Sequence, residues 1–346
     1  ADVSEHPFFA IKAGSLFTPV RNFAPGVLII EGKSVADAGP AGDVRIPAGA
    51  EVLDASHLIV TPGFIDPHIH GCGGVDVMDG SYDSMNTISR ALVRHGTTAF
   101  LPTTVSSPSD RLTGAVEKLG RLMLESFDGA QPLGIHLEGP FISAARRGTH
   151  QADNVLAPDA TLLQKWIRSS GGFLRLLTIA PELDGIDAIV SLAKDSGTTV
   201  AMGHSDATFE QATAAAGRGV CYAVHTFNAM REFTHREPGI AGAVLSDDRI
   251  FAEIIADGIH VSPAAVNIFA RAKGMLRFLL VTDAVSATGM PDGQYVLGSD
   301  KIQVASGVCR NSEGRLAGST LTQEVALRNF VRWTGWPFQD ALRGLT

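Results

Sequence analysis

Five apolar runs along the chain end in a side chain that can bind a metal or carry a proton, and this recurrence constrains the fold more than any other feature. The first run, Leu58–Val60, enters a break at residues 61–63, and residues 64–67 then lead to two histidines one residue apart, His68 and His70. In an extended chain both side chains lie on one face, and paired neutral imidazoles suit a zinc-like ion. An H-x-H pair alone is weak evidence. The other four runs end at Glu138, His204, His225 and Asp283.

Helical patterns alternate with the apolar runs, and this alternation predicts β/α units on a parallel sheet. Eight strands in succession predict a (β/α)8 barrel, a fold of about 250 residues whose catalytic groups lie at the C-terminal ends of the strands. The six metal-binding or proton-handling side chains fall at such ends. The predicted strands are residues 60–68, 98–103, 133–138, 174–180, 199–203, 220–225, 250–256 and 278–283. The predicted helices are 82–95, 109–127, 159–169, 185–195, 209–216, 240–245 and 263–273.

A second, smaller domain is predicted at the N-terminal side. Residues 1–58 read as short strands separated by turns that contain Pro and Gly, which indicates a small β-sandwich-like domain. The barrel then occupies residues 59–346 and carries a β insertion at about 292–318. Two further helical patterns, at 321–333 and 338–345, follow the insertion.

Composition excludes several classes of partner. The net charge is −8, and the sequence has no run rich in Lys and Arg, which argues against nucleic acid or an anionic membrane surface. No apolar run reaches membrane-spanning length. The three cysteines, Cys72, Cys221 and Cys309, lie far apart without a C-x-x-C pair, so neither a disulfide framework nor a thiolate zinc site is indicated. We therefore expect a cytoplasmic protein with a small-molecule substrate.

The barrel, the H-x-H pair, the single histidines on strands five and six and the aspartate on strand eight together resemble the amidohydrolase superfamily. Within it, several motifs resemble the N-acetylglucosamine-6-phosphate deacetylase family, in order from about Val60 to Leu321. The resemblance implies a metal-dependent enzyme that hydrolyses N-acetylglucosamine 6-phosphate to glucosamine 6-phosphate and acetate. The motifs are H-L-E-G-P, G-T-H, G-H-S-D-A-T, H-T-F-N-A-M, H-R-E-P-G, D-G-I-H and T-D-A-V-S-A-T-G.

The resemblance also implies the metal ligands. Glu138, His204 and His225 would be the principal ligands and would leave a coordination position open for water. His68 and His70 would hold a second ion; some family members lack one of these histidines and use a single ion, so the intact pair favours two. Zinc is the expected metal, but imidazole and carboxylate ligands also accept iron, manganese or cobalt.

Catalysis and substrate binding are assigned in the same way. Asp283 would take a proton from the metal-activated water and give it to the departing amine, the alternative being that it is another ligand. His150 would contact the acetyl group or the sugar beside it. Since the chain has no phosphate-binding P-loop, side chains and loop amides must bind the phosphate. The implied phosphate contacts are Asn228, Ala229, Arg236 and His260. Leu316, Ala317 and Gly318 would close over the sugar.

Two alternatives remain. A cyclic amidase of the dihydroorotase or hydantoinase type shares the barrel and the H-x-H pair, but usually bridges its metals with a carboxylated lysine at the end of strand four. Here that strand ends at residues 178–182, which contain no lysine. A catalytically silent barrel scaffold should have lost ligands, and none is missing. A homodimer is the expected assembly, although no residue pattern decides it.

The end of the chain carries one more expectation. The sequence stops at Thr346, just after the helical pattern at 338–345. Relatives in the superfamily usually continue with strands that return to the N-terminal β domain and complete its sheet. We therefore expect a truncated or lost tail, a domain formed mainly by residues 1–58, and an unpaired edge of the kind that favours pairing with other chains.

Overall fold

The computed structural model describes residues 7–346, which form two compact units. The first unit extends to Gly63 and includes Thr346, and the second covers Phe64–Leu345. Within the described residues, no helix has the length and apolar character needed to cross a membrane.

The first unit is a five-stranded sheet. Its central strand, β1, runs antiparallel to β2 and β3 and parallel to β5, and β3 pairs with β4. Ala10, Val27 and Ile29 are buried on one face of the sheet. Among residues 7–63, β4 and β5 each pair with a strand on one side only. The strands are β1 (Phe8–Phe17), β2 (Asn22–Phe23), β3 (Gly26–Glu31), β4 (Ser34–Pro40) and β5 (Glu51–Val60).

The start of the first barrel strand differs from the prediction. The apolar residues Leu58–Val60 belong to β5, where Ile59 and Val60 pair with β1. The chain then passes through Thr61-Pro62-Gly63, and the barrel begins at Phe64. Because both sides of this break are apolar, hydrophobicity alone could not show that the break separates two sheets.

The second unit confirms the predicted (β/α)8 barrel. Successive strands pair in parallel, and a bridge between Ile69 and Ala284 joins the first strand region to the last, which closes the ring. A short strand, β10 (Gln131–Pro132), pairs with β9 at one end. The barrel strands are β6 (Phe64–Ile69), β9 (Thr97–Thr104), β11 (Ile135–Glu138), β12 (Leu174–Ile179), β13 (Thr199–Met202), β14 (Tyr222–Ala223), β15 (Phe251–Ile254) and β16 (Phe278–Leu280).

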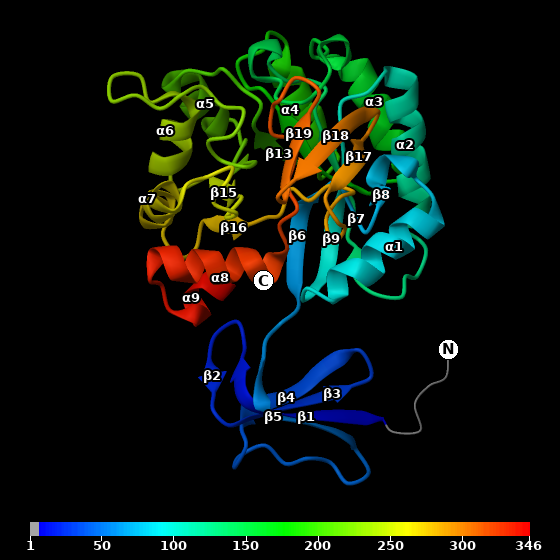
Figure 1. The fold of residues 1–346 in the computed structure, drawn as a ribbon, viewed down its shortest axis with the longest axis vertical. Coiled ribbons are helices and arrows are strands. Elements are labelled where there is room, and N and C mark those ends of the chain that lie inside the picture. The colour runs from blue at the N-terminus through cyan, green and yellow to red at the C-terminus, as the bar shows by residue number, and fades with distance from the viewer. Residues whose placement is uncertain (1–6) are drawn as a thin grey trace. The chain divides into compact units, whose positions relative to one another are not determined.

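Helices surround the parallel strands (Figure 1). Several begin at a residue whose side chain accepts a hydrogen bond from the first turn, such as Ser81, Asp159 and Thr208. The α-helices are α1 (Tyr82–Val93), α2 (Ser109–Leu122), α3 (Ala160–Ser169), α4 (Ile186–Asp195), α5 (Phe209–Gly217), α6 (Gly239–Ser246), α7 (Pro263–Lys273), α8 (Gln323–Thr334) and α9 (Phe338–Leu342). Short elements in the loops are β7 (Gly71–Cys72), β8 (Val75–Asp76), η1 (Val77–Asp79), η2 (Ala144–Arg146) and η3 (Ala152–Asn154).

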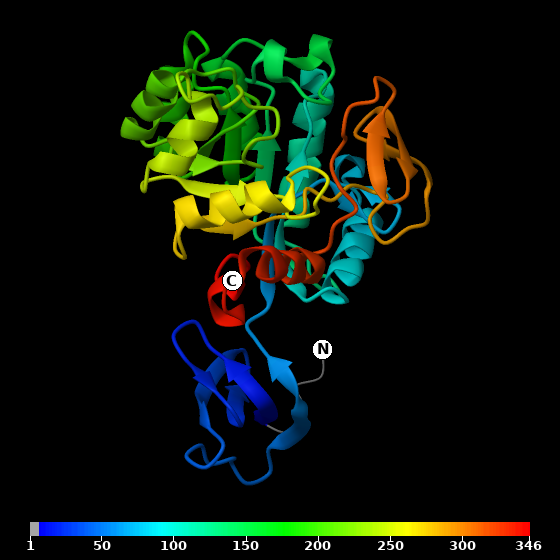
Figure 2. The same cartoon turned by 60° about the vertical axis from the view of Figure 1, so that its left-hand side comes forward.

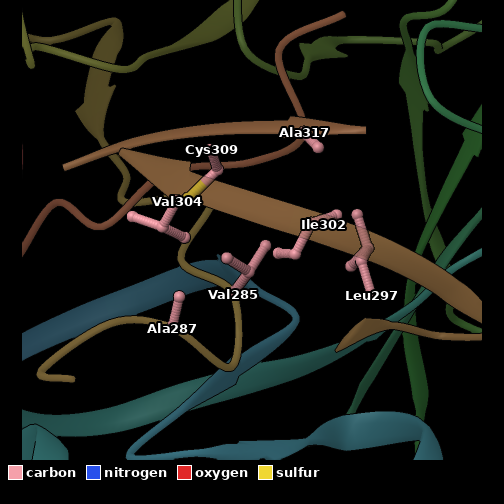
Figure 3. Close-up of a cluster of buried hydrophobic side chains, with 7 residues drawn as sticks. All are labelled: Val285, Ala287, Leu297, Ile302, Val304, Cys309 and Ala317. Carbon is pink, nitrogen blue, oxygen red and sulfur yellow. The ribbon is translucent and has the colours of Figure 1, made fainter. Parts of the chain in front are cut away.

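A three-stranded insert follows the last barrel strand and forms a separate sheet, drawn in orange in Figures 1 and 2. Its strands, β17 (Gly293–Leu297), β18 (Asp300–Ala305) and β19 (Val308–Asn311), pair antiparallel. The insert packs on the loop that follows Asp283, so its apolar side holds that loop in place (Figure 3). The buried residues of this contact are Val285, Ala287, Leu297, Ile302, Val304, Cys309 and Ala317.

Candidate metal centre

The C-terminal ends of the barrel strands bring the six predicted side chains together. His68 and His70 come from the end of β6, and Glu138 is the last residue of β11. His204, His225 and Asp283 follow β13, β14 and β16 within three residues. All six residues are buried.

One group of three atoms has the spacing of ligands around a single ion. The Nε2 atoms of His204 and His225 lie 3.2 and 3.1 Å from Oε1 of Glu138, and 3.1 Å from each other. Ligand atoms about 2.0–2.1 Å from a tetrahedral zinc ion would lie about 3.3 Å apart. Glu138, His204 and His225 therefore fit a divalent cation.

A second group lies beside the first. Nε2 of His68 is 3.3 Å from Oε1 of Glu138, and Nε2 of His70 is 3.3 Å from Oε2. Oδ1 of Asp283 lies 3.2 Å from Nε2 of His70. Nε2 of His68 is buried and has no hydrogen-bond partner among the described residues. Oε1 of Glu138 faces His204, His225 and His68, and Oε2 faces His70, so this carboxylate contacts both groups of histidines and could serve two ions.

Contacts behind the rings select the tautomer that a metal requires. Nδ1 of His204 donates to the carbonyl oxygen of Arg146 at 3.0 Å, and Nδ1 of His70 donates to that of Thr103 at 3.1 Å. Nδ1 of His68 lies 2.8 Å from Oε2 of Glu253. Protonation of Nδ1 leaves each Nε2 lone pair free to face the centre, as in metal-binding histidines.

The backbone is turned out of its strand direction at three of the six residues. His204, His225 and Asp283 have φ angles of 46°, 29° and 50°, a left-handed conformation that residues other than glycine adopt rarely. Gly318, with φ of 58°, approaches Asp283 so closely that a Cβ atom there would lie 2.8 Å from the carbonyl oxygen of Asp283. The sequence gives no local sign of these three strained positions.

The electrostatics of the centre favour a positive charge. Burial by itself lowers the pKa of His68, but the charges of Glu253 and Glu138 outweigh burial and raise that pKa well above its usual value. Burial likewise opposes ionisation of Glu138, yet the neighbouring histidines hold the pKa of this carboxyl well below its usual value. The pKa of Asp283 is lowered against burial through its hydrogen bond to His70. The same carboxylates would stabilise a metal cation bound at the centre.

A pocket of about 140 Å³ opens above the centre. His150 lines it, and the backbone N–H of Ser106 donates to its Nδ1 at 3.1 Å, so the ring proton lies on Nε2. His260 lines it too, with Nδ1 2.7 Å from Oδ2 of Asp257. Burial opposes a charge on His260, but Asp257 raises the pKa of this imidazole. Other predicted substrate contacts that line the pocket are Asn228, Ala229, Leu316 and Gly318.

Two predicted substrate contacts do not line the pocket. Arg236 is exposed on the loop before α6. The side chain of Ala317 is buried in the apolar cluster beneath the insert, although its two neighbours in sequence line the pocket (Figure 3). In an extended segment, alternate side chains point to opposite sides, which explains why Leu316 faces the site and Ala317 the insert.

Sequence reasoning missed Glu253, and it missed the ion pair and the hydrogen bond that hold the loop around His150. Glu253 lies within β15 and is completely buried. Its signal was a charged residue inside an otherwise apolar strand. Arg147 donates to Glu313, and Arg315 donates to the carbonyl oxygen of Gly148, so the insert is tied to the loop after β11.

Comparison with known proteins agrees with the geometry. The model of the amidohydrolase family matches residues 59–345. An N-acetylglucosamine-6-phosphate deacetylase of Vibrio furnissii is 40% identical over 90% of this chain and 74% of its own length. An N-acetylgalactosamine-6-phosphate deacetylase of Escherichia coli O157:H7 is 38% identical over 87% of this chain and 79% of its own length.

A solved structure supports the same relationship. A mutant N-acetyl-D-glucosamine-6-phosphate deacetylase of Mycobacterium smegmatis, in complex with N-acetyl-D-glucosamine-6-phosphate, has a TM-score of 0.88 and 34% identity. The match covers 98% of this chain and 88% of that one. The chain belongs to the amidohydrolase family.

Proposed function

From its membership of the amidohydrolase family, we propose that this protein hydrolyses N-acetylglucosamine 6-phosphate to glucosamine 6-phosphate and acetate. The observation that carries the proposal is the complete set of six side chains beneath a pocket that also contains His260. Relatives with the same activity support it. A scaffold would not need to keep buried carboxylates and imidazoles at ligand spacing.

We propose that two divalent ions, most simply zinc, bind at the strand ends. Glu138, His204 and His225 would hold the first ion. His68 and His70 would hold the second and share Glu138 with the first. Such an ion would activate a water molecule and polarise the carbonyl group of the acetamide.

Asp283 is proposed to carry the proton. Its lowered pKa keeps the carboxylate ionised, so it can accept a proton from the attacking water. As the C–N bond of the amide breaks, Asp283 returns that proton to the leaving nitrogen. His150 carries its ring proton on Nε2, 3.6 Å from Oε2 of Glu138, and this N–H would donate a hydrogen bond to the acetyl oxygen or to a sugar hydroxyl.

The phosphate would lie at the His260 side of the pocket, with Asn228 and Ala229 completing its contacts. Arg236 would contribute from the exposed loop, and Leu316–Gly318 would border the sugar. We further propose a homodimer in the cytoplasm. Three free cysteines are compatible with that reducing compartment.

The test is acetate release by metal-loaded protein from three substrates: N-acetylglucosamine 6-phosphate, its galacto epimer and unphosphorylated N-acetylglucosamine. The first should be the best substrate. Absence of acetate release from N-acetylglucosamine 6-phosphate would contradict the proposal. Elemental analysis should give two ions per chain, and one ion per chain with unchanged activity in His68→Gln would reject the second metal.

A further inference from the structure

Glu253 lies inside the barrel, directly behind the metal centre. Its side chain is completely buried and accepts three hydrogen bonds. Oε2 contacts Nδ1 of His68 at 2.8 Å and the backbone N–H of His225 at 3.1 Å, and Oε1 accepts from the hydroxyl of Tyr222 at 2.8 Å. A buried carboxylate is costly unless it is fully hydrogen-bonded, and these three contacts satisfy it.

His68 differs from the other histidines of the centre in the group behind its ring. His70 and His204 donate Nδ1–H to backbone carbonyls, and Nδ1 of His225 has no partner among the described residues. Only His68, of these four, has a carboxylate behind it. A carboxylate fixes the tautomer and increases the basicity of the opposite nitrogen more than a neutral carbonyl does.

The ring of His68 is also confined from the side. The ring of His136 meets it edge-on, with centroids 4.7 Å apart. His136 is itself held by the hydroxyl groups of Thr178 and Thr103, at 2.8 and 3.3 Å. With Glu253 behind the ring and His136 beside it, Nε2 of His68 is directed towards Glu138, 3.3 Å away.

We propose that Glu253 is a positioning residue that holds His68 with its proton on Nδ1 and thereby sets the affinity for the ion bound by His68 and His70. The inference rests on the proposed two-metal centre, but not on the identity of the substrate. Because Oε2 also accepts the backbone N–H of His225, Glu253 connects the two ligand groups. Its main effect is on the His68 side, where it contacts the ligand ring itself.

The first test measures zinc affinity by competition with a chelator. Glu253→Gln keeps the size of the side chain and removes its charge, and should weaken binding of one ion by about 10–100-fold. The other ion should stay within about threefold. Tyr222→Phe is the matched control: it removes a hydrogen bond to Glu253 but leaves the contact with His68, so both affinities should stay within about threefold of the parent.

A double variant separates positioning from general destabilisation. If Glu253 acts through His68, Glu253→Gln combined with His68→Gln should bind no more weakly than His68→Gln alone. The proposal would be overturned if the losses of zinc affinity in the two single variants added in full in the double variant. It would also be overturned if Glu253→Gln bound zinc as tightly as the parent. Acetate release is assayed separately, so failure of the proposed reaction would not be confused with failure of this inference.

A measurement on the unmodified chain covers the case in which Glu253→Gln does not fold. Long-range ¹H–¹⁵N NMR of the zinc-loaded protein reports which nitrogen of each histidine carries the proton, and the His68 signals are those missing from His68→Gln. We expect His68 protonated at Nδ1. Protonation at Nε2 would overturn the proposal.

Discussion

The candidate metal centre and the side of the pocket proposed to bind the phosphate are built in different ways. At the centre, each ligand lies at a strand end, and His68, His70 and His204 each have a fixed partner behind the ring. At the phosphate side, His260 is held by Asp257 three residues away, and Arg236 is exposed on a loop. Strand ends therefore hold the proposed reacting groups from several elements, whereas specificity for the phosphate would depend on local loop contacts.

The comparison predicts its largest effect at Asp283. Asp283→Asn keeps the size of the side chain but cannot accept a proton, so turnover should fall by about 10²–10⁴-fold. Metal content should remain that of the parent, measured on the same samples. Loss of metal in proportion to turnover would show that Asp283 serves first as a ligand.

A smaller and more selective effect is expected at His260. His260→Asn removes a cation from the pocket, and a charge-assisted contact of about 1.5–3 kcal/mol corresponds to about a 10–100-fold loss of kcat/KM. Hydrolysis of unphosphorylated N-acetylglucosamine should change little, because that substrate has no phosphate group for His260 to contact. An equal loss with both substrates would mean that His260 supports the reaction and not the phosphate.

The difference between the two regions also explains what the sequence could show. The barrel and the six side chains proposed to bind metal or carry a proton were predictable, because apolar runs that end in such side chains recur at five of the eight strands. The left-handed backbone at His204 and Asp283 was not, since neither position carries the glycine that usually marks it. Glu253 was missed because a strand pattern does not show which histidine a buried acid will contact. The position of Arg236 depends on loop conformation, which hydrophobic periodicity does not encode.

Arg236 tests whether the exposed loop contributes to recognition at all. An ion pair made by an exposed side chain is worth at most about 1 kcal/mol, so Arg236→Ala should lower kcat/KM for the phosphorylated sugar by about fivefold or less. The loss should diminish as salt is added, because exposed charges are screened. A loss of 100-fold would show that the guanidinium is enclosed when substrate binds.

The last prediction concerns the pH dependence of phosphate binding. Burial lowers the pKa of His260, and the hydrogen bond to Asp257 raises it above its usual value. The imidazolium is therefore present at low pH and is lost as the pH rises through this raised pKa, so KM for the phosphorylated sugar should increase in that direction. In Asp257→Asn the carboxylate that raises the pKa of His260 is gone, while burial still lowers that pKa. The increase in KM should therefore move to lower pH.

The ratio of KM between Asp257→Asn and the parent is the decisive quantity, because titration of the substrate phosphate near pH 6 affects both proteins equally. The ratio should be near one at low pH, where His260 is charged in both proteins. It should rise as the variant loses its charge, and fall back where the parent loses its own. Unphosphorylated N-acetylglucosamine should give a flat ratio. A flat ratio for the phosphorylated sugar would show that the charge of His260 does not act on the phosphate, and the phosphate side would then depend on neutral contacts from Asn228 and Ala229.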